Sequence, residues 1–292
     1  MSGAQITWLP NGRRLHMNHG PIDLIVEAFG EPAEVQAAYE QAAARFRTIL
    51  EELVSELPEL RRPATLDLPR AFAGTTAQRM EAACVPLAAS FVTPMAAVAG
   101  AVADEMLATM IAGRRLDRAY VNDGGDIAIH LAPGQSMSLA IAGTGHGFAD
   151  RIDMSASSPV RGVATSGWRG RSFSLGIADA VTVLARCGAQ ADAAATLIAN
   201  AVNLAGHPAV KRRPAQDLAP DSDLGERPVT VEVGPLSAAD VNTALNAGRA
   251  VADDLLRRGL IEGAALFLAG RSRICGASQS APWVPREELL HA

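Results

Sequence analysis

A row of polar side chains on an otherwise apolar helix is the strongest chemical signal in the chain. Residues 190–204 are mostly Ala, Leu, Ile and Val, and a helix turns about 100° per residue. Four polar residues then share a narrow arc: Asp192, Thr196, Asn200 and Asn203. Because a buried polar group costs free energy without a partner, this row needs an interaction. A carboxylate and a hydroxyl one turn apart suit a hard cation such as Mg²⁺. Alternatively, Asp192 caps a neighbouring loop and Thr196 bonds to its own helix.

Two glycine-containing corners are further candidate binding elements. The sequence Asn-Asp-Gly-Gly-Asp at residues 122–126 falls between two predicted strands, and its paired glycines permit positive φ and a close backbone approach to a ligand. The sequence Thr-Ser-Gly at residues 165–167 ends another predicted strand, where hydroxyls and amides suit a phosphate. Trp168 follows and offers an aromatic face. The alternative for both corners is an ordinary turn, and for Trp168 a packing residue.

Taken in order, these blocks carry a resemblance. Asn-x-Gly-Gly-Asp, then Ala-Thr-Ser-Gly, then Ala-Asp-x-x-x-Thr at the start of a helix resembles the ApbE-like superfamily, which includes the FAD:protein FMN transferases. The chain looks most similar to a compact, uncharacterised cytoplasmic branch. That similarity rests on Gly-Val-Ala-Thr-Ser-Gly, Ser-Leu-Gly-Ile-Ala-Asp-Ala-Val and Asp-Ser-Asp-Leu-Gly at residues 162–167, 174–181 and 221–225.

The resemblance implies an α+β fold in one domain over residues 1–292, and a Mg²⁺-dependent transferase that uses FAD as substrate or ligand. Asp192 and Thr196 would be the catalytic and metal-binding pair. FMN would pass from FAD to a hydroxyl of a protein acceptor, or the FAD pyrophosphate would be cleaved. The implied nucleotide-binding residues are Asn122, Gly124, Gly125, Asp126, Thr165, Ser166 and Gly167.

One interval departs from the transferase pattern. Residues 168–190 contain neither the His nor the Asp-Pro that the transferases carry there. Two alternatives therefore stay open. The chain is a flavin- or nucleotide-binding protein without transferase activity, or it is an enzyme for a different small molecule on the same scaffold.

Composition narrows the class of protein. The net charge of −5 argues against a nucleic-acid partner. Three separated cysteines without a CxxC motif fit a reducing cytoplasm, and the N-terminus shows no secretory signal. Residues 82–103 carry no charge and consist mainly of Ala, Val, Ser, Thr and Gly with two prolines. We therefore expect a buried helix from Pro94 and no membrane span. The abundant alanine indicates close helix packing and favours a homodimer.

Periodicity predicts strands mixed with helices, which favours an α+β fold of antiparallel strands and packed Ala-rich helices. No internal repeat is apparent. The expected helices are residues 32–57, ended by Pro58, then 94–113, 176–186, 190–204 and 237–258. The expected strands are 22–29, 119–121, 127–131, 136–142, 160–165, 229–233 and 264–269, with a loop at 208–227.

Overall fold

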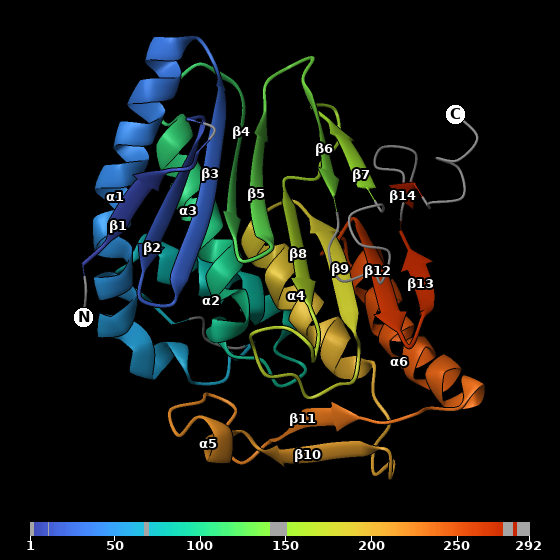
Figure 1. Cartoon of the computed structure of the whole chain (residues 1–292). Helices are drawn as coiled ribbons and strands as arrows, with labels where there is room; N and C mark the ends of the chain where they lie inside the picture. The colour runs from blue at the N-terminus through green and yellow to red at the C-terminus, as the bar shows by residue number, and fades with distance from the viewer. Residues whose placement is uncertain (1–2, 11, 67–69, 141–150, 277–282, 285–292) are drawn as a thin grey trace. The chain divides into compact units, whose positions relative to one another are not determined.

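The computed structural model describes residues 3–10, 12–66, 70–140, 151–276 and 283–284 (Figure 1). They form two compact units. The first comprises Met1–Met137, Ser155–Ala164 and Ala185–Ala193, and the second comprises Ser138–Met154, Thr165–Leu184 and Ala194–Ala292. The predicted α+β class with antiparallel strands and Ala-rich helices is confirmed. A single domain over residues 1–292 stays a prediction.

The first unit is built on an antiparallel sheet whose strands follow chain order. They pair in the order β1-β2-β3-β4-β5, and the beginning of β8 then pairs with β5. In β3 buried and half-buried residues alternate, as expected for a strand with one face on the core. The bounds are β1 Gln5–Trp8, β2 Arg14–His19, β3 Ile22–Gly30, β4 Leu116–Asp123, β5 Asp126–Leu131 and β8 Gly162–Ser166.

Three helices complete most of this unit: α1 (Pro32–Leu60), α2 (Thr75–Cys84) and α3 (Val98–Ile111). Helix α1 contacts β2 and β3, helix α3 contacts β4 and β5, and all three helices contact one another. The short 3-10 turns η1 (Val85–Leu87) and η2 (Pro94–Ala97) connect α2 to α3. The predicted end of α1 at residue 57 is wrong, because the helix continues through Pro58. A proline this near the end removes little hydrogen bonding, and the fully buried Leu60 holds the last turn in the core.

The apolar segment that begins at Pro94 is a largely buried helix, as expected. The segment Pro94–Ile111 has the length and composition to cross a membrane, but 61% of it is buried inside the structure. Ala101, Val102 and Ala103 have no exposed surface at all. The segment consists of η2 followed by α3, and it behaves as a core helix. The expectation of a helix beginning at Pro94 is therefore confirmed in outline.

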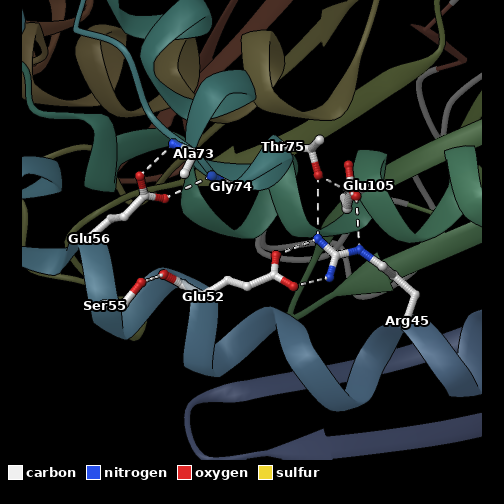
Figure 2. A pocket seen from close by; sticks show the side chains of 8 residues that line it. All are labelled: Arg45, Glu52, Ser55, Glu56, Ala73, Gly74, Thr75 and Glu105. Atoms are coloured by element: carbon white, nitrogen blue, oxygen red, sulfur yellow. Dashed lines mark hydrogen bonds and ion pairs between the residues drawn. The ribbon is translucent and has the colours of Figure 1, made fainter.

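A charged network ties α1 to α2 and α3 (Figure 2). Arg45 donates to both carboxylate oxygens of Glu52 at 2.7 Å and, through Nε, to Glu105 Oε1 at 2.9 Å. Glu105 is buried and also accepts from Thr75 Oγ1 at 2.6 Å and from Arg79 Nε at 3.0 Å. Burial works to raise the pKa of Glu105, but the Thr75 hydroxyl and the two guanidinium groups outweigh it and lower the pKa.

The second unit holds the antiparallel strands β9-β12-β13, with α6 (Ala238–Arg257) packed on β12 and β13. Helix α6 begins with a capping box made by Ser237 and Asp240, as expected for a helix predicted from residue 237. A hairpin of β10 and β11 and the ladder β14-β7-β6 complete it. The bounds are β6 Ser136–Ala140, β7 Arg151–Ser155, β9 Ala180–Ala185, β10 Val210–Pro214, α5 Ala215–Leu218, β11 Pro228–Val233, β12 Gly263–Leu268, β13 Arg271–Cys275 and β14 Trp283–Val284.

Two predicted elements of this region are wrong. Residues 176–186, expected as a helix, contain the strand β9, all of whose residues are buried. A fully buried strand is apolar on both faces, so it lacks the alternation that distinguishes a strand from a helix. Residues 208–227, expected as a loop, contain β10 and the short helix α5. The predicted strand 136–142 is confirmed to Ala140, and its last two residues lie outside the described part.

Candidate functional site

Asp192 lies on α4 (Gly188–Ala201), which begins in the first unit, and its carboxylate caps a different helix. The backbone N–H of Gly100, in the first turn of α3, donates to Asp192 Oδ2 at 3.0 Å, and the N–H of Ala99 also bonds to this carboxylate. The residue at the N-cap of α3 is Ala97, which has no side-chain acceptor. Asp192 therefore performs from α4 the task that an N-cap side chain performs within its own helix.

Asp104 on α3 repeats this arrangement in the opposite direction. Its Oδ1 accepts from the N–H of Gly188 and its Oδ2 from the N–H of Ala189, both at 2.8 Å, so it caps the start of α4. The helices approach closely because both crossing residues are glycine. A Cβ on Gly100 would lie 2.2 Å from the carbonyl oxygen of Gly188. Helices α3 and α4 thus cap each other reciprocally.

The sequence analysis missed Asp104, although a signal for it exists. The pattern Gly-Ala-x-Ala-Asp occurs at residues 100–104 and again at residues 188–192. In both copies the glycine makes the close approach and the aspartate, four residues later, makes the cap. The expectation of no internal repeat overlooked this short recurrence.

The two capping aspartates differ in their electrostatic surroundings. Burial raises the pKa of Asp192 well above its usual range, and the nearby carboxylates of Asp126 and Asp123 raise it further, against the lowering effect of its two backbone hydrogen bonds. Burial also raises the pKa of Asp104, but there the charge that acts on it is the guanidinium of Arg79, which lowers the pKa. Both carboxylates are largely removed from solvent, Asp104 as a buried residue and Asp192 as a half-buried one. Of the two aspartates, Asp192 is therefore the one whose charged neighbours are negative.

The carboxylates near Asp192 come from the turn between β4 and β5. Asp123 and Asp126 are paired residues at the ends of the two strands, and Gly124 and Gly125 connect them with φ of 62° and 117°. The N–H of Gly125 donates to Asn122 Oδ1 at 2.8 Å. This two-residue hairpin turn requires positive φ at both positions, so the fold itself accounts for the glycines. Their predicted role in nucleotide binding stays a prediction.

The other predicted site residues belong to the second unit. Thr165 and Thr182 share a hydroxyl–hydroxyl hydrogen bond of 2.9 Å, and Ser166 is half-buried at the end of β8. A Cβ on Gly167 would lie 2.6 Å from the carbonyl oxygen of Asp179, so close backbone packing accounts for this glycine. Trp168 is half-buried with the Arg169 guanidinium 4.9 Å from its ring centroid. Their predicted contacts with a nucleotide stay predictions.

The remainder of the polar row on α4 also lies in the second unit. Asn200 accepts from the N–H of Leu175 at 2.9 Å, and Asn203 donates to the Leu175 carbonyl at 2.9 Å, so both amides hold one turn of the backbone. Thr196 is half-buried, and its predicted role as a metal ligand stays a prediction. Among the described residues, no group of three or more His, Cys, Asp or Glu has the arrangement of a metal site. A cation at Asp192 would therefore need water or a bound molecule to complete its ligands.

A pH prediction follows from Cys187, the residue just before α4. Burial, together with the charge of Asp104, raises the pKa of its thiol to about 11. Since the thiol of the unfolded chain ionises near pH 8.5, the unfolded state binds fewer protons between about pH 9 and 11, and stability falls as pH rises through that window. Urea unfolding at pH 8, 9.5 and 11 should show this fall in the wild type and a smaller one in Cys187→Ala. Equal falls in the two proteins would contradict the assignment.

The chain matches the protein family described as AbpE bacteria over residues 6–274. The chain belongs to this family. A UPF0280 protein of Methanothrix thermoacetophila is 35% identical to this AbpE family member over 198 residues, which are 63% of the chain and 75% of that protein. A UPF0280 protein of Methanopyrus kandleri is 37% identical over 110 residues, which are 37% of the chain and 43% of that protein. None of these names states an activity.

This membership corrects the assignment to the ApbE-like superfamily. The AbpE bacteria family and the UPF0280 proteins are distinct from the FAD:protein FMN transferases, so the resemblance is not supported as a family assignment. The structure gives a physical reason for the error. In this AbpE family member the blocks that carried the resemblance have structural tasks: Gly124 and Gly125 form a hairpin turn, Gly167 permits close packing, and Asp192 caps α3. Short patterns with such tasks are weak evidence of common function.

Proposed function

We propose that this chain is a Mg²⁺-dependent enzyme that acts on the pyrophosphate of a nucleotide, with a flavin nucleotide as the first candidate substrate. The observation that carries the proposal is the position of Asp192, half-buried and close to Asp123 and Asp126. Neighbouring carboxylates favour the uptake of a proton or a cation, because their charged forms repel one another. Hard oxygen ligands favour Mg²⁺ among the common cations.

The scarcity of protein ligands supports a phosphate-bearing substrate. Mg²⁺ is commonly bound by one or two carboxylates, and its remaining positions are taken by water and substrate phosphates. Asp192 would hold the ion, and Asp123 or Asp126 would assist. When bound, the ion neutralises the negative charge that develops on phosphate oxygens. The chain's own contribution is to hold Asp192 in place, which the amides of Ala99 and Gly100 do.

Incubation of the purified chain with FAD and Mg²⁺ tests this proposal. Hydrolysis of the pyrophosphate would release FMN and AMP, and transfer to a threonine or serine hydroxyl of an acceptor protein would release AMP alone. We expect AMP to appear only when Mg²⁺ is present, and we expect the Asp192→Asn variant to release none. The absence of AMP from FAD and from a panel of other dinucleotides would overturn the proposal. Cytoplasmic location and a dimeric state are part of the same proposal, and cell fractionation and sedimentation test them.

A second candidate is a nucleotide-binding protein without turnover. The observation that favours it is that Asp192 already accepts hydrogen bonds from two backbone amides, so part of its capacity is committed to the cap. Equilibrium dialysis would then show bound FAD or another nucleotide that is recovered intact, and the amount bound would not depend on Mg²⁺. Release of AMP would exclude this candidate.

A further inference from the structure

The reciprocal caps of α3 and α4 form a closed ring within the first unit. From Gly100 to Asp104 the ring follows one turn of α3, and a hydrogen bond of 2.8 Å leads from Asp104 to Gly188. From Gly188 to Asp192 it follows one turn of α4, and a hydrogen bond of 3.0 Å leads from Asp192 back to Gly100. A helical turn is rigid, so the two hydrogen-bonded links determine the geometry of the whole ring.

We infer that Asp104 is a positioning residue for Asp192, and this inference rests on the proposed function of Asp192. Asp104 binds the first two amides of α4 through both of its oxygens and anchors the start of that helix on α3. Asp192 follows one turn later on the same helix. Its place against Gly100, Asp123 and Asp126 therefore depends on that anchor.

The close contact of Gly100 and Gly188 fixes the separation between the backbones of α3 and α4. Besides the 2.2 Å that separates a Cβ on Gly100 from the Gly188 carbonyl, a Cβ on Gly188 would lie 2.8 Å from the Gly100 carbonyl. Real Cβ contacts are longer, so the backbones touch as closely as two chains can. A helix held at this separation and bonded at its first two amides has little freedom to slide. The carboxylate of Asp192 is accordingly held at one position along the axis of α3.

Substitution of Asp104 separates positioning from general stabilisation. Asp104→Asn keeps the shape of the side chain, but its amide group cannot accept from both Gly188 and Ala189. The matched control is Ile49→Val on α1, a fully buried residue outside the ring whose truncation also lowers stability. Two readouts are compared in the wild type and both variants: amide hydrogen exchange at Gly100, and the rise in melting temperature with added Mg²⁺.

The exchange readout tests the inference without any cation. We expect the Gly100 amide to exchange about tenfold faster in Asp104→Asn than in the wild type, as loss of a hydrogen bond to a charged group implies. In Ile49→Val its exchange should change no more than that of other α3 amides. Equal protection of Gly100 in the two variants would overturn the inference, whatever the cation does.

The cation readout tests the proposed function separately. We expect Asp104→Asn to need about tenfold more Mg²⁺ than Ile49→Val for the same rise in melting temperature. If the wild type shows no rise, the proposed function fails, while faster exchange at Gly100 in Asp104→Asn would still establish the positioning of Asp192. If the wild type responds to Mg²⁺ and the two variants respond alike, the inference is overturned and the proposed function stands.

Discussion

Replacement of Glu105 by alanine should lower the free energy of unfolding by about 3 kcal/mol, the scale of a broken buried ion pair. Glu105 is buried on α3 and joins Arg45 of α1 with Thr75 of α2 (Figure 2), and it also accepts from Arg79 of α2. The substitution removes the acceptor of all three side chains. Arg45 keeps its two bonds to Glu52, and Arg79 is exposed enough to reach water, so the loss should fall at the lower end of the range for such pairs.

The control for this prediction is an ion pair on the surface of the same unit. Glu59 pairs with Arg62 at 2.9 Å, and their side chains are 50% and 67% exposed. Glu59→Ala should therefore cost less than about 1 kcal/mol. Urea unfolding of both variants at pH 7 measures the contrast. Similar losses in the two variants would show that the Glu105 network contributes no more than a surface pair.

The pH dependence of the Glu105→Ala effect has a defined sign. The pKa of Glu105 is lowered in the folded protein, so its contribution is fully present above the carboxyl pKa of the unfolded chain, which is about 4.3. The contribution is lost as pH falls through the lower pKa of the folded state. The difference between wild type and variant should shrink in that acid range and should be constant between pH 6 and 8.

The pocket beside this network is lined by residues that connect neighbouring helices. Its volume is about 550 Å³, and it is lined by residues of α1, α3 and the start of α2. Glu56 accepts from the N–H groups of Ala73 and Gly74 at 2.7 and 3.1 Å and so holds the backbone that leads into α2, whose own N-cap is a glycine. Helices α3 and α4 are capped by Asp192 and Asp104 from another element, and Glu56 of α1 fixes the chain just before α2. Tertiary contacts thus help to determine where these helices start.

The elements best predicted from the sequence are those with a clear period. Helix α6 was expected at residues 237–258 and is observed at Ala238–Arg257, because its apolar positions recur on one face and Ser237 marks its start. Strand β3 was expected at residues 22–29 and extends one residue further. Strand β9 could not be recognised in the same way, since both of its faces are buried and its sequence has no alternation.

In the candidate site, the local sequence pattern predicted Asp192 but did not predict its partners. Asp192 stands out because a polar residue on an apolar helix needs a partner. Its actual partners, the amides of Ala99 and Gly100, are more than 90 positions away in the chain. Asp123 and Asp126 are also far from Asp192 in the chain, at 69 and 66 positions. Which carboxylates meet depends on how α4 packs, and a single sequence contains no direct measure of such long-range contacts.

The second large effect concerns Asp192. We expect Mg²⁺ to raise the melting temperature of the wild type at pH 8, and we expect Asp192→Asn to abolish most of this rise, because the loss of one anionic ligand removes much of the attraction for a divalent cation. The matched control is Asp117→Asn, which changes an exposed carboxylate in the same unit by the same atom. Asp126→Asn should reduce the response to an intermediate value if its carboxylate assists.

The response to Mg²⁺ should also depend on pH with a sign that distinguishes a cation site from a simple cap. The pKa of Asp192 is raised in the folded protein, so between about pH 4, where the unfolded carboxyl ionises, and that raised pKa the folded state holds the extra proton. Without a cation, stability falls as pH rises through this window. Mg²⁺ competes with the proton, so it should stabilise the wild type at pH 8 and have little effect at pH 5. If Asp192 serves only as the cap of α3, the loss in melting temperature caused by Asp192→Asn will be the same with and without Mg²⁺. This will hold at each of the two pH values taken separately, and the cation site will then have to be abandoned.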